Sequence, residues 1–67
     1  MAKIQLNGKK VTIKPKVTIH NLLKRFKLNE KKVAIEHNGV IVQRSNYKKK
    51  YLKNNDKLEV VHFIGGG

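Results

Sequence analysis

Residues 3–26 read KIQLNGKKVTIKPKVTIHNLLKRF, and two different hydrophobic periods follow one another in this stretch. In the first half, apolar and polar residues alternate on both sides of Asn7-Gly8, which is the strongest short-range signal of a β-hairpin. We therefore expect strands at roughly 3–7 and 10–14. Pro15 ends the second strand because it has no N–H to donate to a sheet.

The second half of the stretch has the period of an amphipathic helix with one buried face. Its apolar stripe consists of Ile19, Leu22, Leu23 and Phe26. Thr18 is the expected N-cap, and Asn21 stands where a full capping box has Glu or Gln. Asn29 is a suitable stop, so the expected helix is about ten residues long.

Three further strands are expected in the rest of the chain. The first two, Val33–His37 and Val40–Gln43, flank a second Asn-Gly turn, and the last runs from Leu58 to about Ile64. Between them, Ser45–Leu52 has no clean period and is expected to be a loop with a short helical turn. The order β-β-α-β-β-β, with one main helix on a mixed five-stranded sheet, predicts an α+β fold of the ubiquitin-like β-grasp type.

The length of 67 residues limits what the chain does. Domains of about 60 residues bury only about 60% of their extended-chain surface, which disfavours a large enzyme with its own substrate cavity. We expect one domain over residues 1–64 and a flexible glycine tail over 65–67. The absence of cysteine excludes disulfides, thiolate metal sites and a thiol nucleophile. Because no signal peptide and no apolar run of roughly 20 residues is present, we expect a cytoplasmic protein that does not enter a membrane.

The formal net charge is +12, from 16 Lys and Arg against 4 Asp and Glu. A surface of that sign attracts phosphate backbones, anionic lipids and acidic proteins alike, so the charge does not choose among them. Lys48-Lys49-Lys50, between Tyr47 and Tyr51, imitate a nucleic-acid-binding patch, although a solvated loop is the simpler interpretation. A small basic nucleic-acid-binding module is therefore the alternative function. The three histidines and four acidic residues are scattered, which predicts neither a metal site nor an acid–base pair.

Two features near the C-terminus indicate binding of a partner. The glycines Gly65–Gly67 follow the last strand, and their freedom in φ and ψ makes a thin tail that is able to enter a narrow channel. In the last strand, Val61 and Phe63 share a face with Glu59, so the solvent-facing side becomes apolar near the glycines. The expected docking residues are Val61, His62, Phe63 and Ile64. In the alternative interpretation, this end of the sheet is covered from the preceding loop by Tyr47, Tyr51 or Leu52.

Over nearly its whole length the chain resembles the ThiS and MoaD family of ubiquitin-like sulfur carriers. The ThiS branch is favoured by the Asn-Gly hairpin, by Leu22-Leu23 in a helix that starts at Thr18, and by two longer stretches. These are residues 33–44, VAIEHNGVIVQR, and residues 56–67, DKLEVVHFIGGG. The family often has Val-Pro-Arg where this chain has Val-Gln-Arg at 42–44. MoaD-type carriers, which serve molybdopterin synthesis, are usually longer before the last strand and are the weaker match.

The resemblance implies a sulfur carrier for the thiazole half of thiamine, a protein cosubstrate without a catalytic side chain. In such a carrier the terminal carboxylate, here that of Gly67, is adenylated with ATP by a ThiF-type adenylyltransferase. Sulfur from a persulfide-bearing donor protein then displaces AMP, and the resulting thiocarboxylate delivers its sulfur to thiazole synthase, ThiG. Gly65 and Gly66 give Gly67 the reach that both active sites need. No bound cofactor is implied, because the partner enzyme uses the ATP.

Overall fold

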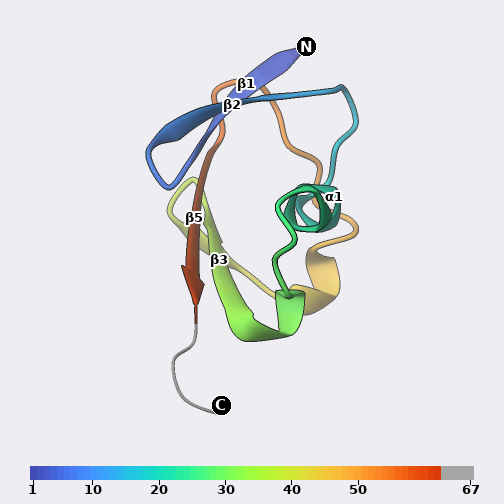
Figure 1. The fold of residues 1–67 in the computed structure, drawn as a ribbon, viewed down its shortest axis with the longest axis vertical. Coiled ribbons are helices and arrows are strands. Elements are labelled where there is room, and N and C mark those ends of the chain that lie inside the picture. Colours follow the sequence, from blue (N-terminus) through green and yellow to red (C-terminus); the bar gives the residue numbers. More distant parts are fainter. Residues whose placement is uncertain (63–67) are drawn as a thin grey trace.

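The computed structural model describes residues 1–62, which form a five-stranded mixed sheet with one α-helix on one face (Figure 1). The strands are β1 (Ala2–Leu6), β2 (Lys9–Ile13), β3 (Val33–His37), β4 (Val40–Val42) and β5 (Lys57–His62), and the helix is α1 (Ile19–Arg25). Two short 3-10 helices, Glu30–Lys32 and Arg44–Asn46, precede β3 and follow β4. The predicted order β-β-α-β-β-β is confirmed.

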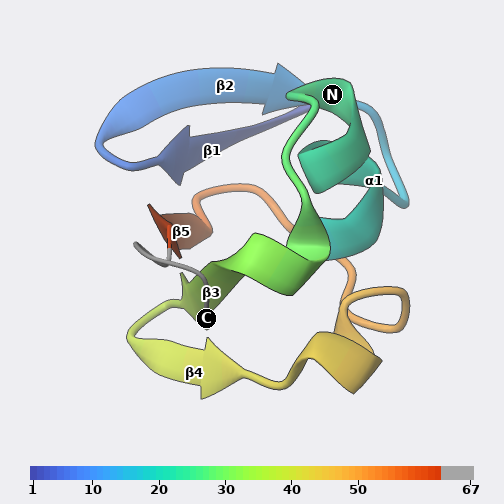
Figure 2. The same ribbon diagram turned by 60° about the horizontal axis from the view of Figure 1, so that its bottom comes forward.

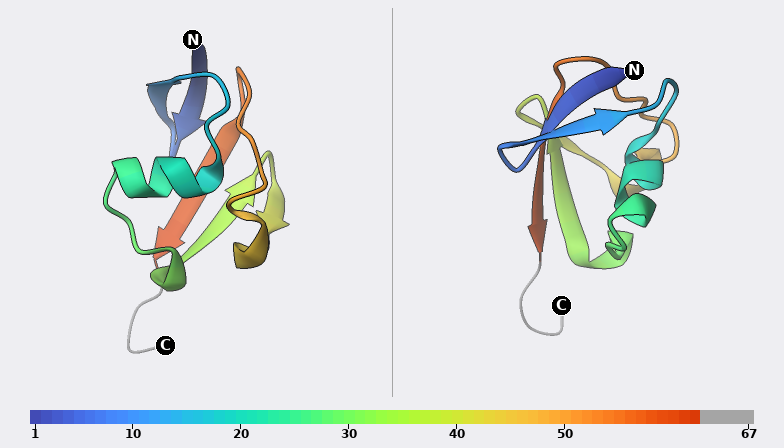
Figure 3. Two further views of the ribbon diagram at one scale, coloured as in Figure 1. Left: turned by 90° about the vertical axis from the view of Figure 1, so that its right-hand side faces the viewer. Right: turned by 45° about the horizontal axis from the view of Figure 1, so that its top comes forward.

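The strand order in the sheet is β2-β1-β5-β3-β4, which Figure 2 shows from top to bottom with α1 to one side. The central strand β5 runs parallel to β1 and antiparallel to β3, and each of these two neighbours forms an antiparallel hairpin with an edge strand. The C-terminal strand therefore lies between the two hairpins. In Figure 3 the teal helix α1 crosses the strand direction on the covered face of the sheet.

Both hairpins turn at the Asn-Gly pairs expected from the sequence. The φ angles are 49° at Asn7, 81° at Gly8, 52° at Asn38 and 85° at Gly39. Two consecutive residues with positive φ match the twist of a type I′ hairpin turn, and asparagine and glycine adopt this conformation at low cost. The turns therefore fix the pairing of β1 with β2 and of β3 with β4.

Most strand limits differ from the predicted ones by one residue. β1 and β2 each begin and end one residue earlier than expected, and β5 begins at Lys57. β4 ends at Val42 because Gln43 caps the following 3-10 helix, whose presence confirms the helical turn predicted for this loop. The predicted end of the last strand near Ile64 lies outside the described residues.

The start of α1 is a complete capping box, although Asn21 stands where Glu or Gln is usual. The Asn21 backbone N–H donates to Thr18 Oγ1 at 3.1 Å, and the Thr18 N–H donates to Asn21 Oδ1 at 3.1 Å. Asn21 thus does the work that Glu or Gln does in the usual box, because its side chain also carries an acceptor oxygen.

The end of α1 corrects the predicted length, since the helix has seven residues and stops before Asn29. Lys27 adopts the left-handed conformation with φ of 57°. The Leu28 N–H donates to the Leu23 carbonyl at 2.9 Å and the Lys27 N–H to the Lys24 carbonyl at 3.0 Å, which is the Schellman pattern of a helix end. Asn29 instead caps the next 3-10 helix, where its side chain accepts from the Lys31 N–H.

The hydrophobic core lies between α1 and the sheet. Its buried apolar residues are Ile4, Ile13, Ile19, Leu22, Leu23, Val33, Ile35, Tyr47, Leu52, Leu58 and Val60. Phe26 was predicted to belong to this stripe, but it follows the last turn of α1 and is 40% exposed, with the Arg25 guanidinium 5.2 Å from its ring centre. No helix in the described part of the chain is long and apolar enough to cross a membrane.

Candidate functional site

The strand β5 divides its side chains between the two faces of the sheet. Leu58 and Val60 point into the core and are 1% and 8% exposed, whereas Val61 is 56% exposed. Glu59 is exposed as well, on the face that Val61 shares. This alternation confirms the predicted parity of β5 within the described residues and places Val61 on the open side of the sheet.

The face of the sheet away from α1, here called the outer face, carries the surroundings of Val61. The register pairs Val61 with Ala34, and Glu36 with both Glu59 and Ile41, so these residues form two adjoining rows on one face. Ile41 is 63% exposed. Val61 and Ala34 therefore form an apolar row toward the end of β5, and the next row holds Ile41 and the two neighbouring carboxylates.

The loop between β4 and β5 does not cover the outer face. Tyr47 and Leu52 are buried in the core. The His20 N–H donates to the Tyr47 carbonyl at 3.0 Å, and the Leu52 N–H donates to the Val17 carbonyl at 2.8 Å, so the loop is tied to the start of α1. The interpretation in which Tyr47, Tyr51 or Leu52 shields this end of the sheet is therefore wrong for Val61.

The predicted site residues divide at the end of the described chain. Val61 and His62 are the last two residues of β5, both are exposed, and they pair with Ala34 and Val33. The other predicted site residues lie outside the described residues: Phe63, Ile64, Gly65, Gly66 and Gly67. Within the described residues, the predicted docking surface is therefore represented by Val61 and His62 alone.

The fold brings together an acid and a base that lie far apart in the sequence, His37 and Asp56. His37 Nε2 lies 2.7 Å from Asp56 Oδ2, so a ring N–H is able to donate to the carboxylate. Asp56 also accepts from the Asn38 side chain at 3.1 Å and from the Lys53 backbone N–H at 2.8 Å. These hydrogen bonds join the β3–β4 turn to the beginning of β5, so the Asp56 carboxylate has a structural role.

The hydrogen bonds of Asp56 also set its ionisation. Burial alone would raise the pKa of Asp56, but the hydrogen bonds from His37, Lys53 and Asn38 favour the ionised form and hold the pKa below its ordinary value of 3.8. Asp56 is therefore a carboxylate at neutral pH. In the described residues no group of three or more acidic or histidine side chains is arranged to hold a metal ion.

The lysine-rich loop lacks half of the aromatic surface that the nucleic-acid interpretation needs. Tyr47 is only 2% exposed, and burial raises the pKa of its hydroxyl above 10.0. Tyr51 is exposed beside Lys48, Lys49 and Lys50. One exposed tyrosine among lysines forms no platform on which successive bases stack.

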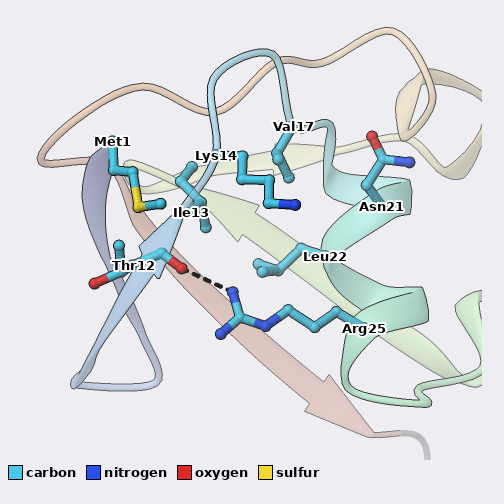
Figure 4. A pocket seen from close by; sticks show the side chains of 8 residues that line it. All are labelled: Met1, Thr12, Ile13, Lys14, Val17, Asn21, Leu22 and Arg25. Carbon is cyan, nitrogen blue, oxygen red and sulfur yellow. Dashed lines mark hydrogen bonds between the residues drawn. The ribbon is translucent and has the colours of Figure 1, made fainter.

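A separate hollow of about 400 Å³ lies between β2 and α1 (Figure 4). Its floor contains Ile13, Val17 and Leu22, and Arg25 crosses one side to donate from Nη1 to the Thr12 carbonyl at 2.7 Å. The hollow has no carboxylate or histidine among its described lining residues to act as a general base, and it lies on the helix side of the sheet, away from Val61.

The sequence model of the ThiS family matches residues 4–67 of this chain. The sulfur carrier protein ThiS of Bacillus subtilis strain 168 is 42% identical over 65 residues, which cover 96% of this chain and 98% of the relative. This chain superposes on the crystal structure of the thiamine biosynthesis protein (ThiS) from Geobacter metallireducens with a TM-score of 0.82. The match has 28% sequence identity and covers 97% of this chain and 99% of that chain.

Two curated thiazole synthases contain a region similar to this chain. The identity is 42% over 65 residues for Magnetococcus marinus and 38% over 65 residues for Paramagnetospirillum magneticum. Each match covers 97% of this chain but 20% of the relative, so the chain spans about one fifth of the length of these two proteins.

Proposed function

The chain belongs to the ThiS family, and from this premise we propose that it is the sulfur carrier protein for the thiazole moiety of thiamine. The observation that carries the proposal is the 42% identity to a sulfur carrier protein over 96% of this chain and 98% of that relative. The similar regions in two thiazole synthases support the same pathway. The fold supports it as well, because the TM-score to a ThiS crystal structure is 0.82.

In this proposal the reactive group is the main-chain carboxylate of Gly67. A free carboxylate is a poor acylating agent, so a ThiF-type adenylyltransferase joins it to AMP from ATP and releases pyrophosphate. The terminal sulfur of a persulfide attacks the acyl carbon and displaces AMP. A second thiol then attacks the sulfur of the donor's cysteine and breaks the S–S bond. This step leaves a thiocarboxylate on Gly67 and a disulfide between the donor's cysteine and the second thiol.

The outer face supplies the docking surface for the partner enzymes in this proposal. Val61 and Ile41 are apolar and exposed on a face that no described element covers. Exposed apolar residues on an uncovered face are typical of protein-binding sites. Phe63, Ile64 and His62 are the further proposed docking residues, with His62 at the end of β5 on the parity of Val60. Gly65 and Gly66 give Gly67 its reach into the active site of each partner.

The protein is proposed to be a cosubstrate and to bind no cofactor of its own, since ATP is used by the adenylating partner. Within the described residues, His37 at the end of β3 is paired with Asp56 just before β5, which supports a structural role for these two titratable groups. The partners are a ThiF-type adenylyltransferase, thiazole synthase and a persulfide-bearing sulfur donor. The cytoplasmic location predicted from the sequence belongs to the same proposal.

Intact-mass measurement tests the proposal. The protein is incubated with ATP, a ThiF-type enzyme and a persulfide donor, and the expected product has one oxygen replaced by sulfur. Reactions without ATP, and a variant that lacks Gly65–Gly67, are the controls and should show no gain. An unchanged mass of the full chain, with a partner that is active on its own carrier, would contradict the proposal.

A second stage separates thiamine synthesis from molybdopterin synthesis. The thiocarboxylated protein is offered either to thiazole synthase with its other substrates or to a molybdopterin synthase catalytic subunit. The proposal expects thiazole formation and return of the mass to the unmodified value with the first enzyme only. Consumption by the molybdopterin enzyme alone would instead assign the chain to MoaD-type function.

A further inference from the structure

The side chain of Asn7 takes the place of a strand residue beside β5. β1 ends at Leu6, and the backbone turns away at Asn7 with φ of 49°. The side-chain amide nevertheless continues the ladder. The Val60 N–H donates to Asn7 Oδ1 at 2.6 Å, and Asn7 Nδ2 donates to the Val60 carbonyl at 3.1 Å. A single planar group with both an acceptor and a donor is required for this double contact, and asparagine provides it.

The contact between Asn7 and Val60 is the last described hydrogen-bonded contact of β5 on the side of β1. Backbone pairing between β1 and β5 ends at Leu6 with Leu58, and the Asn7 N–H donates to the Leu58 carbonyl at 2.9 Å. Beyond Val60, the described part of β5 pairs only with β3, as far as His62. Val60 is therefore the last described residue of β5 that is fixed from both sides before the chain continues toward the glycines.

We propose that Asn7 is a positioning residue for the sulfur-carrier reaction, because its grip on Val60 fixes the direction in which the chain leaves the sheet toward Gly67. The inference rests on the proposed function and deepens it. Asn7 touches no reacting atom and acts only through Val60. Without the grip, the end of β5 is held by β3 alone and splays over a wider range of directions, which lowers the fraction of carriers whose tail is aimed into the adenylating site.

The kinetic signature of this role is a split between KM and kcat. A lower fraction of binding-competent carrier raises the apparent dissociation constant by the same factor and leaves the bound complex unchanged. In Asn7→Gly, which keeps the positive φ of the turn, we expect the KM of the adenylyltransferase for the carrier to rise about three- to tenfold at constant kcat. The rate of adenylation of the full chain is measured by the ATP–pyrophosphate exchange assay.

Two variants separate positioning from stability. Asn7→Asp keeps the oxygen that accepts from the Val60 N–H but loses the donor to the Val60 carbonyl, so its KM is expected between those of wild type and Asn7→Gly. Asn54→Gly is the matched control, because Asn54 Oδ1 also accepts a strand backbone N–H, that of Lys3 in β1 at 2.8 Å, at the end of β1 far from Asn7. Its KM should equal that of wild type whatever its effect on the melting temperature.

Amide hydrogen exchange reports the grip directly. The Val60 amide should exchange faster in Asn7→Gly than in wild type, while the amides of β3 keep their protection. An unchanged KM in Asn7→Gly, or an equal rise in Asn54→Gly, would overturn the inference even when wild type is adenylated normally. A wild-type chain that is not adenylated at all would instead refute the proposed function, so the two failures are distinguishable.

Discussion

A substitution of Val61 tests the proposed docking surface most directly among the described residues. Its side chain is 56% exposed on the outer face, so a charged substitution removes little core packing. For Val61→Arg we expect the free energy of unfolding to change by less than about 0.5 kcal/mol. The KM of the adenylyltransferase for the carrier should rise about tenfold, because a cation replaces an apolar contact at the interface.

The matched control for Val61→Arg is Tyr51→Arg, an equally exposed position at 55%, beside α1 and away from the outer face. Its KM should stay at the wild-type value. If Val61→Arg unfolds the domain, the residue is part of the core and its assignment to the docking surface is wrong. If both variants bind the enzyme like wild type, docking takes place elsewhere.

Asp56 links stability to pH through its hydrogen bonds. Its pKa in the folded protein lies below the ordinary 3.8. The stabilisation is therefore fully present above about pH 4, and it is lost as pH falls through the folded-state pKa, because the unfolded chain binds the proton first. Urea titrations from pH 7 down to about pH 2 should show a loss of stability at the acid end to which Asp56 contributes.

Asp56→Asn is expected to flatten that acid limb and to be less stable than wild type at pH 7 by about 1–3 kcal/mol, because it removes the charge from a buried hydrogen-bond network. Glu59→Gln, the same change at an exposed carboxylate, is the control and should leave the limb in place. An acid limb as steep in Asp56→Asn as in wild type would show that other groups cause the pH dependence.

At the scale of the elements, the capping box decides where α1 begins and hence how the helix lies on the sheet. Thr18→Ala removes the oxygen that accepts from the Asn21 N–H and should lower the free energy of unfolding by about 1 kcal/mol. Thr18→Ser keeps the oxygen and should cost less. Urea midpoints at pH 7 measure both, and equal stability of the alanine and serine variants would mean that the cap contributes nothing measurable.

The sequence predicts the elements whose signals are local. Asn7-Gly8 and Asn38-Gly39 are recognisable because few residues tolerate the positive φ values of a type I′ turn. The alternation of β5 is readable because one buried face imposes a period of two. The end of α1 was misjudged because Lys27 adopts positive φ without glycine or asparagine to announce it.

The contacts that the sequence does not predict are those that depend on which strands become neighbours. His37 and Asp56 meet because β3 lies beside β5, and nothing in either local pattern pairs them. Ile41 comes to lie on the same face as Val61, in the row of Glu36 and Glu59, through the register of β4 on β3 and of β3 on β5. Asn7 reads as a turn residue, and its second task beside Val60 follows only from the parallel pairing of β1 with β5.

For the whole molecule, the charge of +12 is less informative than where the charges lie. Asp56 is paired with His37 before the start of β5, and a Glu30 carboxylate oxygen lies 3.6 Å from His20 Nδ1. In contrast, Glu36 and Glu59 lie side by side on the outer face. The face proposed for docking thus holds two of the four acidic residues of a strongly basic chain. By the same alternation Lys3, Lys10 and Lys57 share that face, so the two carboxylates lie among cations there.

The small size of the domain suits the task of a carrier. The described residues form a core with α1 on one face of the sheet, and the other face is left open beside β5 (Figure 1). A carrier that is chemically modified at its main-chain end needs a rigid domain for recognition and a narrow terminal segment for reaction. In the proposed function, recognition therefore takes place at the outer face and the chemistry at Gly67.

Fragmentation of the product by tandem mass spectrometry tests this central claim most directly. After reaction with ATP, a ThiF-type enzyme and a persulfide donor, the account predicts that one sulfur replaces one oxygen in C-terminal fragments that contain Gly67, and that N-terminal fragments lacking Gly67 keep their mass. Sulfur found on any other residue, or no sulfur in a reaction that modifies an established carrier, would contradict it.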